Sequence, residues 1–562
     1  MKAFGFILLQ FVLVAGFSQS RSFRNYQVED GLSHNSVISM LQDHRGFMWF
    51  GTKDGLNRFD GYNYKSFQHI PGDSTSLGSN FIRCLYEVEN KIWVGTDTGL
   101  FTYDEKTETF NLLYQTKDQP ILDIESDAQG NIWFIASGNL HRYNVKSQTD
   151  EVYDQAYFGL LTTSTEGTLY VATQDSIFYY VPETNSLQKL PVNAGDVEPV
   201  ITELDASLSP KQLYVGTKDQ GVLVYSIASR KTESLFEKDQ NPLFVRDFLL
   251  KNTGELWIAS ESGLFIYDLR NQTFQNLKKN YNNPYSLSDN AIYALVKDQE
   301  GGIWLGTYFG GVNYYPKPYT PFKRYFPRVG ENSISGNAVR EIEEDRYGNL
   351  WIGTEDAGLN RFNPVSGKFE NFKPQSDGGD LAHYNIHGLL PRGSQLWIGT
   401  FEHGLDVMDI QTGKVIKHYD SRTGKGNLRS DFVVYIYETK NSDLYILTSQ
   451  GVYKYLFASD SFELVEEFPE IYHYTFLLED HQGILWAGTY WDGLYYYNPA
   501  TKEKGFYKYD RNDTTSISSN VINGIFEDSR NRLWITTENG FNRLERELGK
   551  FTRITKSEGL PA

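Results

Sequence analysis

Short apolar runs separated by polar, glycine-containing turns recur along the whole chain. One unit starts with an apolar run such as residues 338–342 and passes through an Asp-x-x-Gly turn into a strand centred on tryptophan. A strand of the Gly-Leu-Asn-Arg-Phe type follows, and a final strand lies near a Phe-x-x-Phe or Phe-x-x-Tyr pair. Apolar runs of this length between such turns indicate β-strands. Each unit therefore predicts four short strands.

The tryptophan strand is the most regular part of the unit, as in residues 46–52, 91–96 and 348–354. Its copies recur about every 44 residues, which is the length of a propeller blade. The twelve central aromatic residues are Trp49, Trp93, Trp133, Tyr170, Tyr214, Trp257, Trp304, Trp351, Trp397, Tyr445, Trp486 and Trp534. One such sheet cannot bury both faces alone, so the sheets are expected to stack around an axis with the aromatic residues between neighbours. The pattern predicts an all-β fold of tandem β-propellers.

A proline-rich segment, residues 315–321, follows the seventh aromatic residue, and a central strand would not tolerate it. We therefore predict a complete seven-bladed propeller over residues 22–320 and a second propeller over residues 321–562. Phe-Arg-Asn-Tyr at 23–26 resembles Phe-Lys-Arg-Tyr at 322–325. Each propeller is thus expected to begin with the outer strand that closes its own last blade.

The second propeller contains five of the twelve repeats. Residues 551–562 resemble the start of a further blade, so we predict that the second propeller is truncated in this sequence. A five-bladed second propeller is the alternative, but it leaves this last segment without a purpose.

The first residues and the overall charge limit where the chain acts and what it binds. Residues 1–18 have a positive start and an apolar run too short to span a bilayer comfortably, which predicts a signal peptide and export. No later segment is apolar for long enough to cross a membrane. The formal charge of -18 would repel a phosphate backbone over most of the surface, so we expect no nucleic-acid partner for this region.

The Trp-Ile-Gly-Thr-x-x-Gly-Leu pattern and the Asp/Asn-x-x-Ser-Leu/Ile-x-x-Asn loops, as in residues 73–80 and 513–520, carry a family resemblance. The chain resembles the periplasmic sensor region of hybrid two-component system histidine kinases, whose repeats are two-component regulator propellers. The resemblance implies a periplasmic sensing region that detects oligosaccharides. It also implies a longer parent with a membrane span, a histidine kinase and a DNA-binding module, and a homodimer formed through that parent. This chain itself is expected to be no enzyme and to bind no cofactor.

Candidate ligand-binding residues lie in the turns that follow the Gly-Thr pairs. In a propeller these turns and the starts of the innermost strands open on the same rim. Most turns, such as residues 53–54, lack aromatic residues, but three are aromatic: Tyr308-Phe309, Phe401-Glu402-His403 and Tyr490-Trp491-Asp492. Exposed aromatic rings can stack on sugars while neighbouring polar groups bond hydroxyls. Packing against the adjoining propeller or a partner is the alternative.

Four polar residues occupy similar positions on the innermost strands: Arg83, Arg246, Arg340 and His387. They could hold an acidic sugar, or they could pair with acidic neighbours. They complete the predicted ligand-binding set.

Catalytic and metal sites are not indicated. Asp43 and Asp345 recur in Asp-x-x-Gly turns and Asp528 in an equivalent turn, where a carboxylate accepts hydrogen bonds from its own turn. His383 and His387 would lie about 13 Å apart on a strand, too far to share a metal ion. The segment 510–513 lacks the later glycine and glutamate of a calcium loop.

Two other functions stay open at this point. A secreted propeller enzyme acting on polysaccharide, such as a lyase, would need a base or a metal near a cationic funnel. A protein-binding scaffold would use the aromatic rim to dock a partner.

Overall fold

The computed structural model describes residues 21–153, 158–192, 199–236, 243–317, 323–374, 381–423, 427–470 and 473–555. In this described part of the chain the strands form twelve four-stranded antiparallel sheets, which confirms the all-β, tandem-propeller fold class. The signal peptide proposed for residues 1–18 and the proposed domain boundary at 320/321 lie outside the described residues. The chain divides into two compact units, Met1–Lys323 (unit 1) and Arg324–Ala562 (unit 2).

Unit 1 holds seven of the sheets, and the inner strand comes first in six of them. The strands of these six sheets are β2 (Val37–Gln42), β3 (Met48–Thr52), β4 (Gly55–Phe59), β5 (Tyr64–Phe67); β6 (Ile82–Val88), β7 (Lys91–Thr96), β8 (Gly99–Asp104), β9 (Thr109–Leu112); β10 (Ile121–Ser126), β11 (Ile132–Ala136), β12 (Asn139–Asn144), β13 (Thr149–Tyr153); β14 (Leu160–Thr163), β15 (Leu169–Ala172), β16 (Ile177–Val181), β17 (Ser186–Leu190); β18 (Ile201–Asp205), β19 (Gln212–Thr217), β20 (Val222–Ser226), β21 (Lys231–Ser234); β22 (Val245–Asn252), β23 (Glu255–Ser260), β24 (Gly263–Asp268) and β25 (Thr273–Leu277). The seventh sheet joins β26 (Ile292–Lys297), β27 (Ile303–Thr307) and β28 (Val312–Tyr315) to β1 (Arg24–Tyr26). Two short 3-10 helices, Val28–Asp30 and Tyr114–Thr116, lie between strands.

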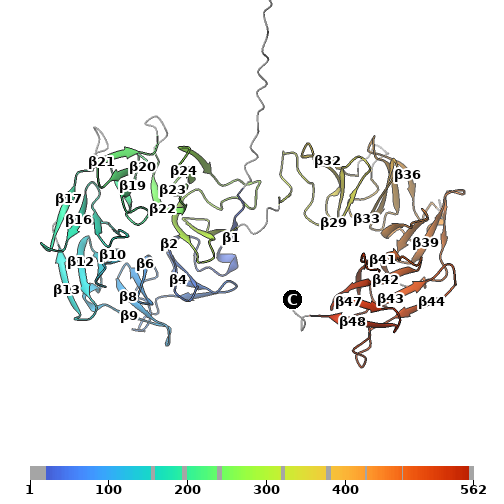
Figure 1. The fold of residues 1–562 in the computed structure, drawn as a ribbon, viewed down its shortest axis with the longest axis horizontal. Helices are drawn as coiled ribbons and strands as arrows, with labels where there is room; N and C mark the ends of the chain where they lie inside the picture. Colours follow the sequence, from blue (N-terminus) through green and yellow to red (C-terminus); the bar gives the residue numbers. More distant parts are fainter. Residues whose placement is uncertain are drawn as a thin grey trace, which may run out of the picture. The chain divides into compact units, whose positions relative to one another are not determined.

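The sheets of unit 1 close into a ring. The inner strands follow one another from β2 to β26, and β26 packs against β2 again (Figure 1). Strand β1 pairs with β28, with Arg24 opposite Tyr314 and Tyr26 opposite Val312, as the repeat pattern predicts. The first strand of the chain therefore completes the last blade of the ring.

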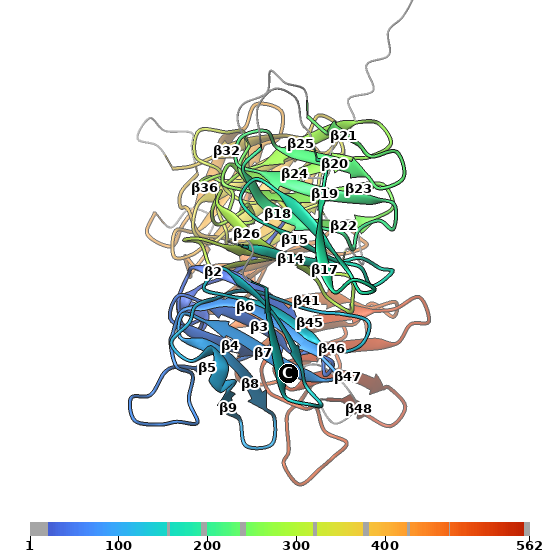
Figure 2. The ribbon, with the colours of Figure 1, turned by 90° about the vertical axis from the view of Figure 1, so that its left-hand side faces the viewer.

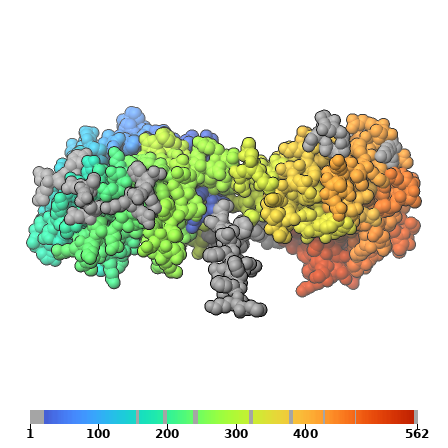
Figure 3. Space-filling model, turned by 90° about the horizontal axis from the view of Figure 1, so that it is seen from above, coloured from blue at the N-terminus to red at the C-terminus, as the bar shows by residue number. Residues whose placement is uncertain are grey.

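In the other six blades of unit 1 the strands lie in sequence order from the axis outward, as β6 to β9 show in Figure 2. Apolar side chains of adjacent blades pack together, and the face of unit 1 seen in Figure 3 runs without a break across neighbouring blades. The central tryptophans supply much of this packing; Trp49, Trp133 and Trp257 are fully buried.

Asp-x-x-Gly turns, and the related Asp-x-x-Asn turn at residues 528–531, hold the tryptophans in place. A tryptophan stands six residues after each of these aspartates, and its indole Nε1 donates a hydrogen bond to the aspartate carboxylate. The pairs are Asp43–Trp49 (2.9 Å), Asp127–Trp133 (2.9 Å), Asp298–Trp304 (3.0 Å), Asp345–Trp351 (2.9 Å), Asp480–Trp486 (2.8 Å) and Asp528–Trp534 (2.9 Å). The other carboxylate oxygen accepts amides of the turn, as Asp43 Oδ1 does from Arg45 and Phe47. These aspartates are therefore structural.

The Gly-Thr pair shapes the contact between blades. A Cβ on Gly353 would lie 2.8 Å from Cγ2 of Ile386 in the next inner strand, so only glycine leaves room for that strand. The hydroxyl of Thr354 donates to the carbonyl of Gly358, 2.8 Å away, and fixes the turn that follows. The motif thus sets blade spacing and turn shape together.

Unit 2 holds five sheets. Their strands are β29 (Val339–Glu344), β30 (Leu350–Thr354), β31 (Gly358–Asn363), β32 (Lys368–Phe372); β33 (Ile386–Arg392), β34 (Gln395–Thr400), β35 (Leu405–Asp409), β36 (Lys414–Tyr419); β37 (Val433–Glu438), β38 (Leu444–Thr448), β39 (Gly451–Leu456), β40 (Ser461–Leu464); β41 (Tyr474–Glu479), β42 (Leu485–Thr489), β43 (Leu494–Tyr497), β44 (Lys504–Tyr507); β45 (Ile522–Glu527), β46 (Leu533–Thr537), β47 (Gly540–Glu545) and β48 (Lys550–Ile554).

These five sheets form an open arc in the described residues. The inner strands pack in the order β29, β33, β37, β41 and β45, and Figure 1 shows the arc open between its first and last sheets. Apolar side chains are exposed on the two end sheets: Val339 and Ile342 on the first, Phe526 and Phe541 on the last. In sheets inside the arc, the neighbouring blade covers the corresponding face.

Candidate functional site

A β-bulge near the start of the inner strands places one side chain per blade at the end of the sheet. Each described inner strand except β14 shifts its register with the second strand at this point. The residues skipped by the pairing include Arg83, Arg246, Arg340 and His387. A bulge leaves its extra residue unpaired and redirects its side chain. The four residues predicted on the inner strands therefore do occupy equivalent positions.

The bulge side chain meets the first residue of the turn after the Gly-Thr pair, or of its variant, in the same blade. The pairs are Arg83–Asp97 (Nε to Oδ1, 2.5 Å), Arg246–Glu261 (Nε to Oε1, 2.8 Å), Arg340–Glu355 (3.0 Å), Tyr293–Tyr308 (ring centroids, 5.0 Å) and His387–Phe401 (ring centroids, 5.9 Å). We call the set of bulge and turn residues of a unit its rim. The two classes of predicted ligand-binding residue thus lie together on one end of each unit.

The rim of unit 1 contains a stack of cationic and aromatic groups. The ammonium of Lys53 lies 3.8 Å from the centre of the Tyr308 ring, which packs against Tyr293. The guanidinium of Arg246 lies 4.3 Å from the centre of the Tyr293 ring and 3.9 Å from that of Phe244. A cation that lies over an aromatic ring is attracted electrostatically to the face of the ring. The stack joins the first, seventh and sixth blades of the ring.

Two further rim residues of unit 1 differ in their surroundings. Phe309 is 72% exposed and packs edge-on against Tyr308 with 4.6 Å between ring centroids. Glu261 accepts hydrogen bonds from Arg246 and from the hydroxyl of Tyr293, so the guanidinium charge is already compensated. Burial, together with the hydrogen bond to Glu261, raises the pKa of Tyr293 to about 12.

The rim of unit 2 carries a continuous row of rings from three neighbouring blades. We call this row the aromatic ridge; it consists of Phe401, His387, Phe432, His473, Trp491 and Tyr490. Centroid distances along it are 5.9 Å for His387–Phe401, 4.9 Å for Phe401–Phe432, 6.1 Å for Phe432–His473, 5.2 Å for His473–Trp491 and 4.8 Å for Trp491–Tyr490. Trp491 is 60% exposed, whereas His387 is only 7% exposed. The ridge therefore has an open end and a buried end.

Histidines line the buried end of the ridge. The rings of His383 and His403 stack in parallel with centroids 4.2 Å apart. Burial and the charge of His403 lower the pKa of His383. Burial and the charge of Arg340 also lower the pKa of His387, to about 4. In the described part of the chain, no group of three or more His, Cys, Asp or Glu side chains is arranged to hold a metal ion.

Some contacting residues could not be selected from the sequence. Phe432, His473 and Phe244 each stand directly before the first paired residue of an inner strand, a position that the pattern marks as part of the rim. Their aromatic or imidazole rings at this position are the sequence signal that distinguishes them. Lys53 lies in a turn without aromatic residues, and its contact with Tyr308 depends on ring closure between the first and seventh blades.

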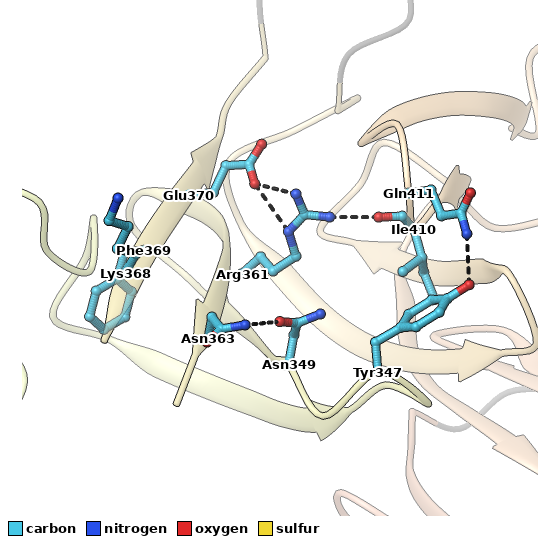
Figure 4. Close-up of a pocket in the computed structure, with 9 residues that line it drawn as sticks. All are labelled: Tyr347, Asn349, Arg361, Asn363, Lys368, Phe369, Glu370, Ile410 and Gln411. Atoms are coloured by element: carbon cyan, nitrogen blue, oxygen red, sulfur yellow. Dashed lines mark hydrogen bonds and ion pairs between the residues drawn. The ribbon is translucent and has the colours of Figure 1, made fainter. Parts of the chain in front are cut away.

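A hollow of about 640 Å³ lies away from the rim, between the first two blades of unit 2 (Figure 4). Its lining residues are Tyr347, Asn349, Arg361, Asn363, Lys368, Phe369, Glu370, Ile410 and Gln411. Arg361 donates to Glu370 and to the carbonyl of Ile410 at 2.6 Å, and Gln411 donates to the hydroxyl of Tyr347 at 2.9 Å. These groups bond one another across the blade boundary, so the hollow belongs to blade packing.

Several acidic side chains lie on inner strands of unit 1, among them Asp123, Glu203 and Asp247. Asp123 accepts the amide of Leu161 in the next blade at 2.7 Å, and Asp247 accepts that of Leu295 at 2.6 Å. Burial raises the pKa of each of these two aspartates to about 7. Burial and the charges of Asp247 and Asp123 raise the pKa of Glu203. The folded ring therefore holds protons that the unfolded chain would release.

Replacing Glu203 by glutamine is expected to stabilise unit 1 at pH 8 by about 1 kcal/mol, because a desolvated carboxylate near two others is disfavoured when ionised. Since the folded-state pKa is raised, the folded state binds more protons than the unfolded state, and stability falls as pH rises from about 4 to 8. Thermal melts across this range measure the effect. The gain should vanish near pH 4, and Glu233→Gln, on the outer strand of the same blade, should show no gain. An equal gain at all pH values would contradict the explanation.

A family model described as two component regulator propeller matches residues 31–54, 286–309, 333–356 and 516–539. Each segment runs from the loop before an inner strand to the turn that follows the Gly-Thr pair or its variant. These four segments are two-component regulator propeller repeats. The matched segments contain the rim residues Lys53, Tyr293 and Tyr308 of unit 1 and Arg340 and Glu355 of unit 2, whereas the residues of the aromatic ridge lie outside them.

Two kinds of relative accompany this match. A histidine kinase of Formosa agariphila is 42% identical over 76 residues, 13% of this chain and 6% of the relative's length. The extracellular domain of a putative hybrid two-component system from B. thetaiotaomicron has the same fold, with a TM-score of 0.62 and 21% identity over 96% of this chain and 79% of that one. The extracellular domain of a putative one-component system from the same organism has a TM-score of 0.46 and 20% identity, over 95% of this chain and 79% of that one.

The chain thus contains segments that match the regulator propeller repeat. It also shares its fold with an extracellular domain of a putative two-component system. Among the described residues, the structure has no helix with the length and apolar character that a membrane crossing requires.

Proposed function

We propose that this chain is the extracytoplasmic ligand-binding region of a two-component sensor and that it binds an oligosaccharide along the aromatic ridge of unit 2. The regulator propeller repeats and the shared fold support the sensor role. The ridge carries the choice of ligand, because the exposed rings of Tyr490 and Trp491 offer stacking surfaces for sugars and the half-buried rings beside them continue the apolar surface. Aromatic faces stack on pyranose rings while adjacent polar groups bond the hydroxyls.

Signal output lies outside this chain in the proposal. A longer parent would carry the histidine kinase, the membrane span and the contacts of a homodimer, and this chain would act in the periplasm. The ligand can change the kinase only if it binds two states of the sensor with different affinity. We assign this chain no catalytic residue and no cofactor.

Trp491→Ala is expected to weaken oligosaccharide binding by about 1–2 kcal/mol without lowering stability, because an exposed stacking ring contributes to the complex and little to the core. Isothermal titration calorimetry with the oligosaccharides that bind the unaltered chain measures the first effect. Thermal melts measure the second.

Phe506→Ala is the matched control, since Phe506 is an exposed aromatic residue on β44, the outer strand of the same blade. It should leave affinity unchanged. Unchanged affinity of Trp491→Ala together with a large fall in melting temperature would assign Trp491 to packing instead. Cleaved products in the titration mixture would move the chain to the polysaccharide-degrading enzymes.

A further inference from the structure

The buried end of the aromatic ridge contains a polar atom without a partner. Nδ1 of His387 makes no hydrogen bond in the structure, although the side chain is 7% exposed. Its ring lies against Phe401 and Phe432, with centroids 5.9 and 4.9 Å away, so the imidazole is part of the ridge. A buried polar atom without a hydrogen bond is costly, and one at a rim indicates a partner that arrives with a ligand.

A second unpartnered atom lies two residues earlier in the chain. The side-chain oxygen of Asn385 is buried and accepts no hydrogen bond. The backbone carbonyl of Asn385 accepts the amide of Phe401 at 3.0 Å, which holds this residue beside the ridge turn. One end of the ridge therefore contains a buried amide oxygen and a buried imidazole nitrogen that have no hydrogen-bond partner in the protein.

The charges around this end do not suit an anion. Arg340 is paired with Glu355 at 3.0 Å, so its charge is compensated. The turns also carry Asp356 and Glu402, and Glu402 is exposed beside Phe401. Burial lowers the pKa of His387 to about 4, with a contribution from Arg340, so the imidazole is neutral near pH 7. A neutral imidazole provides one donor and one acceptor, as hydroxyl groups require.

We propose that the ridge recognises an uncharged oligosaccharide, with one sugar hydrogen-bonded through its hydroxyl groups to His387 Nδ1 and Asn385 Oδ1. This inference rests on the proposed function and narrows the class of ligand. An acidic sugar would be repelled by the exposed carboxylate of Glu402 beside Phe401. A cationic amino sugar would be attracted to this carboxylate, but its ammonium group cannot accept a hydrogen bond from the imidazole, whereas a hydroxyl group can both donate and accept.

The first test is a glycan array probed with the full chain. It should display uncharged oligosaccharides of glucose, xylose, mannose, arabinose and galactose, acidic oligosaccharides of galacturonate, mannuronate and sulfated galactose, and oligomers of glucosamine. Calorimetry then measures the hits. Binding confined to uncharged members supports the inference. Binding confined to acidic members or to glucosamine oligomers overturns the inference and leaves the proposed function standing, whereas binding to no glycan overturns both.

The second test is His387→Phe, which keeps a ring of similar shape and removes both nitrogens. Affinity for the uncharged hit should fall about tenfold or more, because hydroxyls lose their partner, while the melting temperature should stay level or rise, because the unsatisfied atom is gone. A residue with only a structural role would not combine these two changes. Unchanged affinity would overturn the assignment of His387.

Two further variants complete this test. His481→Phe is the control. His481 lies in the Asp-x-x-Gly turn at residues 480–483, away from the rim, and its ring is hydrogen-bonded to Glu527. Affinity should not change in this variant. Asn385→Ala keeps the inference testable if His387→Phe does not fold. It should also weaken binding of the uncharged hit, and full retention of affinity in Asn385→Ala would count against the site.

Discussion

Trp351→Ala is expected to lower the free energy of unfolding of unit 2 by about 3–5 kcal/mol, the usual cost of removing a large buried aromatic side chain. Trp351 is fully buried between the first two sheets of the unit, against Leu359, Ile386 and Leu389. Its indole nitrogen also donates to the carboxylate of Asp345, which is itself buried. Alanine would leave a cavity between two blades and a buried carboxylate with one donor fewer.

Chemical denaturation followed by tryptophan fluorescence and by circular dichroism measures this loss. Trp351→Phe provides the comparison, because it keeps much of the ring but removes the donor to Asp345, and it should cost less than alanine. A loss below about 1 kcal/mol for Trp351→Ala would show that this tryptophan is not part of a tightly packed core.

Opening the ring of unit 1 should cost still more. Phe23→Ala combined with Tyr26→Ala is expected to destabilise unit 1 by about 5 kcal/mol or more, since two aromatic residues of the closing strand are removed together. Phe23 is 2% exposed, and the ring of Tyr26 stacks on Trp304 with centroids 5.9 Å apart. Without these anchors β1 would be held by its backbone hydrogen bonds to β28 and by the Asn25 side chain, which donates to the carbonyls of Pro284 and Ser286.

Thermal melts, with limited proteolysis to assign each transition to its unit, measure this effect. Proteolysis should also show faster cleavage in the seventh blade, whose outer edge is then unprotected. Tyr62→Ala is the control, because Tyr62 is highly exposed in the turn between β4 and β5 of the same ring. If the double variant melted like the unaltered chain, closure by β1 would not stabilise the ring.

Most of the fold could be predicted from the sequence because the repeat carries its own physical reasons. Tryptophan, the aspartate six residues before it and the Gly-Thr pair recur together, and in the structure they form one hydrogen-bonded and packed unit, as at Asp345, Trp351 and Gly353. The closing role of β1 was predictable from the likeness of residues 23–26 and 322–325. The signal peptide and a continuation of the second propeller beyond five blades stay predictions.

The site was predictable only in part. The aromatic turns and the inner-strand residues were predicted to share a rim, but register shifts cannot be read from periodicity, and the bulge is what turns His387 toward Phe401. Contacts between blades were also out of reach, since Phe432 and His473 join the ridge from different repeats. Binding at Arg83, Arg246 and Arg340 stays a prediction, and each of these arginines pairs with a carboxylate of its own blade.

The bulge and the turn have a consequence for how such chains diverge. The backbone of each rim position is fixed by groups that do not depend on the rim side chain, such as the Thr354 hydroxyl on Gly358 and the room that Gly353 leaves for Ile386. Two positions per blade can therefore change without disturbing the core, as the shift from Arg340 and Glu355 in one blade to His387 and Phe401 in the next already shows. Specificity can evolve on this scaffold by independent substitutions, blade by blade, at little cost in stability.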